Sequence, residues 1–149
     1  MKWTMIDPAT HTYVVVGEPG EEAFGLLNDF ARERNLTAAS LGAVGAFSRA
    51  VVGWFDREAL DYRRIEIGEQ CEVLSLLGDV ALGADGPEVH ANVVLGLADG
   101  TVRGGHLLSG LVSPTLEVIV RENPASLRKT MHPEMGLALI DVPRSEGTE

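Results

Sequence analysis

The residues best suited to chemistry in this sequence are two histidines, His90 and His106, together with Asn92. His90 and Asn92 are two residues apart in the apolar segment 89–97, which predicts a strand, so their side chains point to the same face. A neutral imidazole can bind a metal ion or transfer a proton near neutral pH. The other two histidines are expected at the surface, near turns: His11 and His132.

The turn after this strand decides whether His106 joins the same face. Residues 98–100, Ala-Asp-Gly, are typical of a β-hairpin. A two-residue loop would place His106 opposite Val93 and on the wrong face, whereas a three-residue loop would place it opposite Asn92. Gly100 suits the left-handed position that ends a three-residue loop. We therefore predict that both histidines and Asn92 share one face of a hairpin.

Three interpretations of this cluster stay open: a hydrogen-bonded polar patch, a metal site for an ion such as zinc, or a catalytic site with His106 as general base. Asparagine offers zinc only a hard carbonyl oxygen. Glu117 is the expected supporting carboxylate, because a carboxylate can orient an imidazole. Arg49 and Arg103 are candidates for holding an anionic ligand.

Alternating apolar and polar residues predict an α+β domain, mainly an antiparallel, glycine-rich sheet of about seven or eight strands with one main helix at 21–35. Residues 38–55 are expected to form two strands joined by a bend or bulge, because three glycines would weaken a helix there. A short helix is expected at 124–129 and a frayed tail at 143–149. The other strands are expected at 11–16, 62–67, 71–77, 89–97, 102–108, 115–120 and 137–140.

The chain has 149 residues, 45% of them hydrophobic, as in one globular domain, whose core we expect at about residues 10–142. Its net charge is −10, which disfavours duplex-DNA binding because that depends on lysine and arginine at phosphates. We expect a cytoplasmic protein with no membrane segment, because no leader-like or long apolar run is present. The single cysteine, Cys71, lies in an apolar strand and is expected to be buried.

Four segments resemble the PPC (plant and prokaryote conserved) domain family. Residues 88–108, with Gly-Gly-His-Leu at 104–107, are similar to the signature hairpin of the prokaryotic members. The family's Pro-Thr-x-Glu and Glu-Ile-Leu-Ser-Leu-x-Gly stretches are matched by 113–118 (SPTLEV) and 72–78 (EVLSLLG). Residues 41–46 (LGAVGA) fit its glycine-rich early strand.

This resemblance implies a homotrimer and a fold that looks related to acetolactate decarboxylase, which uses a three-histidine zinc site. Family members often carry a second histidine where this chain has Asn92. Prokaryotic members are often labelled DNA-binding, but the Arg-Gly-Arg-Pro core of the plant AT-hook is missing here. We expect a homotrimeric assembly or regulatory module that associates with itself or other proteins. The alternative is a metal-dependent enzyme or a binder of a small anionic metabolite at His90, Asn92 and His106.

Overall fold

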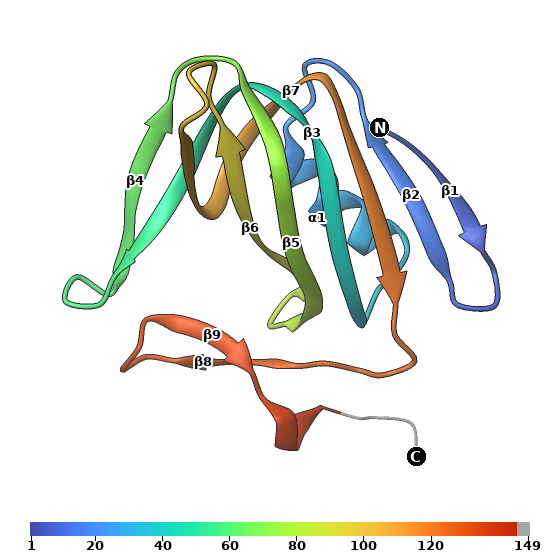
Figure 1. Ribbon diagram of the computed structural model, residues 1–149. Coiled ribbons are helices and arrows are strands. Elements are labelled where there is room, and N and C mark those ends of the chain that lie inside the picture. Colours follow the sequence, from blue (N-terminus) through green and yellow to red (C-terminus); the bar gives the residue numbers. More distant parts are fainter. Residues whose placement is uncertain (146–149) are drawn as a thin grey trace.

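Nine strands and one main helix make up the described part of the chain, residues 1–145 of a computed structural model (Figure 1). The predicted α+β class, mainly antiparallel with one main helix, is confirmed. The elements are β1 (Lys2–Asp7), β2 (Thr12–Gly17), α1 (Ala23–Glu33), β3 (Ala38–Asp56), β4 (Asp61–Ile67), β5 (Cys71–Gly83), β6 (Gly86–Gly96), β7 (Val102–Glu122), β8 (Lys129–His132), β9 (Leu137–Ile140) and the 3₁₀ turn η1 (Val142–Arg144).

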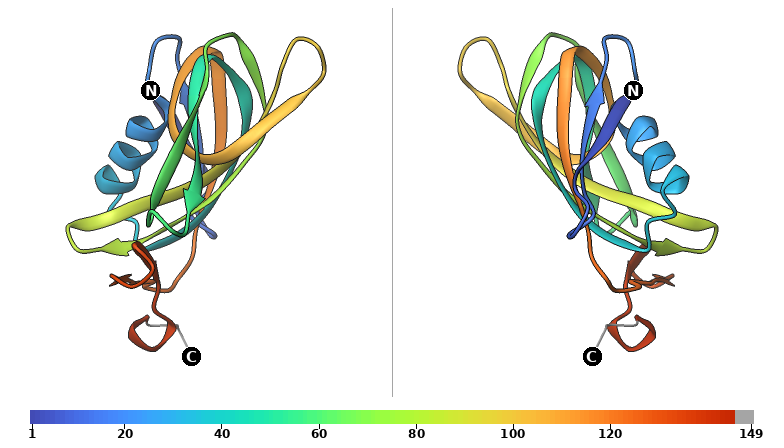
Figure 2. Two further views of the ribbon diagram at one scale, coloured as in Figure 1. Left: turned by 90° about the vertical axis from the view of Figure 1, so that its left-hand side faces the viewer. Right: turned by 90° about the vertical axis from the view of Figure 1, so that its right-hand side faces the viewer.

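Two long strands, β3 and β7, organise the main sheet. They pair antiparallel along most of their length, and the other edge of β3 pairs first with β5 and then with β4. The other edge of β7 pairs with β6 at its start and with β2 at its end. Because β5 also pairs with β6, strands β3, β5, β6 and β7 form a closed circuit. The sheet is therefore strongly curved, with α1 on one side of it (Figure 2).

The expectation of two strands at 38–55 is wrong, because β3 runs unbroken through this segment. The predicted bulge is present: the register with β5 shifts between Ala43 and Gly45, and that with β7 between Gly45 and Phe47. Gly45 has φ +154°, and an added Cβ would lie 2.3 Å from the Thr115 carbonyl oxygen. The segments 102–108 and 115–120 likewise belong to one strand, β7.

Helix α1 covers the core because its apolar residues recur on one face. It buries Ala23, Leu26, Leu27, Phe30 and Ala31. The carboxylate of Glu22 accepts hydrogen bonds from the first backbone amides, so the helix begins later than predicted. It also ends earlier, at Glu33. No helix in residues 1–145 is long and apolar enough to cross a bilayer.

The chain after β7 differs most from the prediction. No helix forms at 124–129, because backbone groups of Leu127 bond to other segments: its N–H donates to Thr37 and its carbonyl accepts from Leu82. Strand β9 pairs with β8 in a separate two-stranded sheet instead of joining the main one. This hairpin lies across one end of the main sheet (Figure 1). Within the expected tail, 146–149 lie outside the described residues.

Candidate functional site

Five side chains from five strands form a row on the face of the main sheet that points away from the core. The ring centroids of Tyr62 and His106 are 4.5 Å apart, and those of His106 and His90 are 5.2 Å apart, stacked in both cases. His90 Nδ1 lies 3.4 Å from Asp79 Oδ2, and Lys129 Nζ lies 3.3 Å from Asp79 Oδ1. We call these five residues the histidine row.

The strand register explains how the row forms. Asn92 is directly opposite His106, as the three-residue loop predicts. Within that loop Gly100 has φ +82°, and the N–H of Leu97 donates to the carbonyl of Thr101 at 2.9 Å. Across the other edge of β6, His90 faces Asp79. The predicted placement of the two histidines and Asn92 on one face is thus confirmed.

Tyr62 reaches His106 across a glycine. Gly53 of β3 is opposite His106, and an added Cβ at Gly53 would lie 2.7 Å from Tyr62 Cδ1. The missing side chain therefore leaves the space in which the Tyr62 ring lies over the sheet. Burial raises the pKa of the Tyr62 phenol, so this group stays protonated at neutral pH.

Lys129 enters the row from β8, and only 7% of its side chain is exposed. Burial alone would raise the pKa of Asp79, but the contact with His90 and the charge of Lys129 outweigh it and lower that pKa. Asp79 Oδ1 accepts no well-aligned hydrogen bond in the described structure, although Lys129 is at ion-pair distance. The Lys129–Asp79 contact is therefore mainly an attraction between charges.

His106 is the most constrained group of the row. Burial lowers the pKa of its imidazole, and the charges of His90 and Lys129 lower it further. Its Nδ1 atom is buried and has no hydrogen-bond partner among residues 1–145. At neutral pH the row therefore contains both an uncharged imidazole with an unused polar atom, that of His106, and a buried ammonium group, that of Lys129.

Three other residues that the sequence suggested as members of the site lie outside the row. Glu117 lies in the other half of β7, opposite Val16 and Val44. Arg103 is opposite Leu95, a buried core residue, and so is on the face away from His106. Arg49 is exposed and lies four positions before Gly53 along β3. The carboxylate that contacts an imidazole of the row is Asp79 instead.

Sequence reasoning missed Asp79, Lys129 and Tyr62. For Asp79 a signal exists: strand β5 extends to Gly83, and the two-residue loop Ala84-Asp85 pairs Gly83 with Gly86, which sets Asp79 opposite His90. Counting back from that turn would have found the pair. No comparable signal points to Lys129 or Tyr62, because both reach the row through contacts between distant segments.

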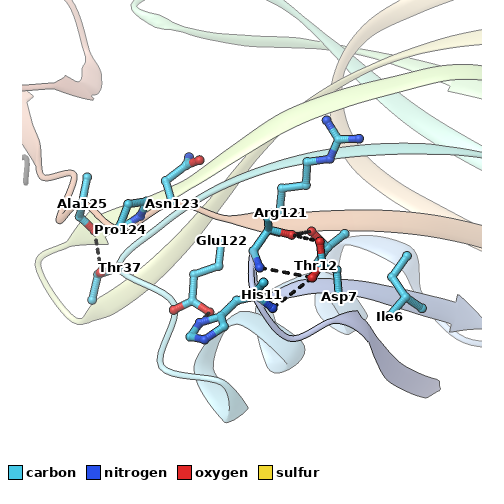
Figure 3. A pocket seen from close by; sticks show the side chains of 12 residues that line it. Ile6, Asp7, His11, Thr12, Thr37, Arg121, Glu122, Asn123, Pro124 and Ala125 are labelled. Carbon is cyan, nitrogen blue, oxygen red and sulfur yellow. Dashed lines mark hydrogen bonds and ion pairs between the residues drawn. The ribbon is translucent and has the colours of Figure 1, made fainter.

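A hollow of about 1040 Å³ lies elsewhere on the surface, near the β1–β2 turn (Figure 3). Exposed His11 lies 3.2 Å from Glu122 there, and the hydroxyl of Thr37 donates to the Ala125 carbonyl. None of the residues lining it belongs to the histidine row. Cys71 is buried as predicted, and burial raises the pKa of its thiol, so it is not a reactive thiolate.

The fold and the hairpin that carries the histidines define a known family. The chain belongs to the family described as Plants and Prokaryotes Conserved (PCC) domain, which matches residues 7–124. A plant- and prokaryote-conserved (PPC) protein from Pyrococcus horikoshii is 30% identical, with a TM-score of 0.82, over 87% of this chain and 90% of that chain. The family resemblance seen in the sequence is thereby confirmed.

Further relatives differ in what their names say. A metal-containing protein from Archaeoglobus fulgidus is 32% identical over 87% of this chain and 91% of that one, with a TM-score of 0.77. A protein from Bacteroides thetaiotaomicron, whose name carries a provisional DNA-binding assignment, shares the fold at a TM-score of 0.88 and 23% identity, over 95% and 99% of the two chains.

Two more matches are partial. A protein from Staphylococcus aureus, described as similar to alpha-acetolactate decarboxylase, shares the fold distantly, at a TM-score of 0.54 and 12% identity over 74% of this chain and 52% of that one. The bifunctional protein GlmU of Synechococcus sp. (strain JA-3-3Ab) is 31% identical over 125 residues. That match covers 83% of this chain, which spans about a fifth (19%) of that relative's length.

The residues of the row do not fit a zinc ion within one chain. Zinc sites use several nitrogen, sulfur or carboxylate ligands around one point, but among residues 1–145 no three His, Cys, Asp or Glu side chains converge in this way. The two imidazoles are stacked, with 28° between their planes. The third predicted ligand is Asn92, and the ammonium of Lys129 opposes a second cation nearby.

Proposed function

We propose that this protein is a self-associating assembly or regulatory module that works as a homotrimer. The observation that carries the proposal is an apolar strip on the face of the main sheet that points away from the core. The strip consists of side chains exposed by 40% to 67%: Val44, Leu74, Leu77, Val94 and Ile119. Large apolar patches of this kind on a soluble domain typically mark a protein–protein interface.

The register places these side chains next to each other. Ile119 of β7 and Leu77 of β5 flank Gly42 of β3, so two apolar side chains stand on either side of a position without one. Knobs beside a small gap can interlock with side chains of a neighbouring copy, and in a closed cyclic trimer each subunit meets the next through such a heterologous contact. Exposed Glu117 lies at the edge of the strip, opposite Val44.

The test is the mass of the native assembly, measured by sedimentation equilibrium and native mass spectrometry. A trimer is expected for the unmodified chain. Leu77→Glu, which puts a charge at the most exposed member of the strip, should shift the population to monomers because an unpaired buried charge is costly. Val142→Glu is the matched control: Val142 is 74% exposed but lies on η1, away from the sheet. A monomeric native chain would refute the proposal.

A second candidate function is the binding of a small anionic metabolite at the histidine row. The buried ammonium of Lys129 and the unpartnered Nδ1 of His106 favour it, because both can donate to an anion. Thermal unfolding in the presence of a panel of small carboxylic acids and phosphate esters tests it. A ligand that stabilises the chain, and loses this effect in His106→Gln, is expected.

A further inference from the structure

The hollow near the β1–β2 turn is lined by a row of residues from three neighbouring strands. Asp7 of β1 is opposite Thr12 of β2, and Thr12 is opposite Arg121 of β7. Residues directly opposite each other share a face of the sheet, with Cβ atoms about 5 Å apart. All three line the hollow, whose volume of about 1040 Å³ is at the upper end of the range for small-molecule pockets. A negative and a positive side chain therefore flank one threonine in one hollow.

The hydroxyl groups in this hollow donate in a fixed direction. The Thr10 hydroxyl donates to Asp7 Oδ2 at 2.7 Å, and the hydroxyl oxygens of Thr10 and Thr12 are also 2.7 Å apart. Because a hydroxyl has one proton, Thr12 must donate to Thr10. The Thr12 oxygen and the Asp7 carboxylate, which is ionised at neutral pH, thus have only lone pairs left to offer. This side of the hollow suits a ligand that donates hydrogen bonds, above all a cation.

Arg121, on the other side of Thr12, has the opposite character. Its guanidinium carries five N–H donors and no acceptor, and no hydrogen bond or ion pair from the other residues of the hollow reaches it (Figure 3). The second carboxylate of the hollow, Glu122, is engaged by His11 Nδ1 and by the Tyr13 hydroxyl, each at 3.2 Å. A free guanidinium fork matches the two oxygens of a carboxylate.

We propose that this hollow binds a free α-amino acid with an apolar side chain, its carboxylate on Arg121 and its ammonium group on Asp7 and Thr12. The site is separate from the histidine row and goes beyond both candidate functions. The ligand's side chain would lie on the apolar residues of the hollow, of which Ile6 is 53% exposed: Ile6, Ala9, Pro124 and Ala125.

The charges and the spacing of the row favour an amino acid over a simple ion. Asp7 would repel an anion, and Arg121 would repel a cation, whereas a ligand with both charges is attracted by both residues. Two strand spacings of about 4.8 Å each separate Asp7 from Arg121. The two charged groups of an amino acid span this gap when the long arginine side chain reaches toward Thr12.

NMR titration of the isotope-labelled native assembly tests the proposal with three probes of similar hydrocarbon shape. L-leucine carries both charges, isocaproate lacks the ammonium group, and isoamylamine lacks the carboxylate. L-leucine should move the backbone amide signals of Thr10, Thr12 and Asn123. It should bind about tenfold more tightly than either other probe, the weight of a hydrogen bond to a charged group.

Two variants assign each charged contact to its residue. Arg121→Gln should weaken the binding of L-leucine about tenfold. Asp7→Asn should remove the preference for L-leucine over isocaproate, while the amide oxygen still accepts from the backbone of the turn, as Asp7 does from Ala9. Arg57→Gln is the matched control, because Arg57 is exposed in the β3–β4 turn and does not line the hollow.

Three results would overturn the inference, and the first two need no variant that folds. If L-leucine moves none of the amide signals of the hollow, the site does not exist. If isocaproate binds as tightly as L-leucine, the hollow recognises an anion alone, and the role of Asp7 is refuted. If Arg121→Gln and Arg57→Gln bind L-leucine equally well, the carboxylate does not lie on Arg121.

Discussion

Charge in the histidine row is controlled by single side chains whose neighbours differ. Burial and the coulombic interactions with His90 and Lys129 lower the pKa of His106, whereas the contacts with His90 and Lys129 lower the pKa of Asp79 in spite of burial. Two titratable groups of the same row are thus driven toward opposite charge states, His106 uncharged and Asp79 charged. This is an arrangement found at functional sites more often than elsewhere.

The lowered pKa of His106 makes the stability of the fold depend on pH. The ordinary pKa of histidine is 6.5. Just below that pH the imidazole of His106 is protonated in the unfolded chain, whereas in the folded chain, where its pKa is lower, it is still mostly uncharged. The contribution of His106 to the free energy of unfolding is therefore complete above about pH 6.5 and is lost as the pH falls from there through the folded-state pKa. Urea unfolding of the unmodified protein should show this loss, and His106→Gln should remove it.

Asp79 provides a separate check, because its contribution to the stability of the fold is lost over a lower pH range. Its ordinary pKa of 3.8 is lowered in the fold, so its contribution is present above that value and is lost as the pH falls below it. If the stability of His106→Gln still declined just below about pH 6.5, another group would be the cause of that decline.

Strands β3 and β7 hold the elements together, because each pairs with several others. β3 changes partner from β5 to β4 between Phe47 and Ala50 without a break, and the bulge at Gly45 lies shortly before this point. A bulge increases the bend and twist of a strand, and this bend allows β3, β5, β6 and β7 to close their circuit. The row depends on this closure, since the pairing of β3 with β7 sets Gly53, and beside it Tyr62, against His106.

Gly45→Ala should therefore be strongly destabilising, by about 3 kcal/mol or more, because the new Cβ would meet the Thr115 backbone and φ is positive. Denaturant unfolding measures this loss. Gly42→Ala on the same strand is the control: its Cβ would meet only ordinary contacts at 3.7 Å, so the monomer fold should tolerate it. Equal losses in the two variants would show that the bulge does not need glycine.

For the whole molecule, charge is the feature that limits its partners. The net charge of −10 repels the phosphates of duplex DNA, and just two lysines are present, one of them buried beside Asp79. A relative whose name carries a DNA-binding assignment shares the fold at 23% identity, and a shared fold does not carry a function with it.

We therefore predict that the native assembly does not retard duplex DNA in a gel, even at low salt, where the phosphate attraction is greatest. The comparison is a charge-reversed variant of the exposed acidic residues Glu58, Glu66 and Glu69 to lysine, which should gain weak binding that salt abolishes. Salt-sensitive retardation by the unmodified protein would reveal a local basic surface that outweighs the total charge.

Local rules of the sequence determined the helix, the α+β class and the register of the β6–β7 hairpin. The number of residues in a turn sets which side chains of two adjacent strands face each other, so the position of His106 opposite Asn92 follows from the length of the turn alone. The family resemblance also followed from the sequence, because its motifs are short and occur in order.

Only the tertiary structure decided which distant segments complete the row. Lys129 is the last residue of the segment that was expected to be a helix, and it reaches Asp79 because the backbone around Leu127 bonds to Thr37 and Leu82. Tyr62 reaches His106 because β3 and β7 pair along most of their length and Gly53 leaves room between them. Turn lengths and periodicity describe neighbours along the chain, whereas these contacts depend on how a curved sheet closes on itself.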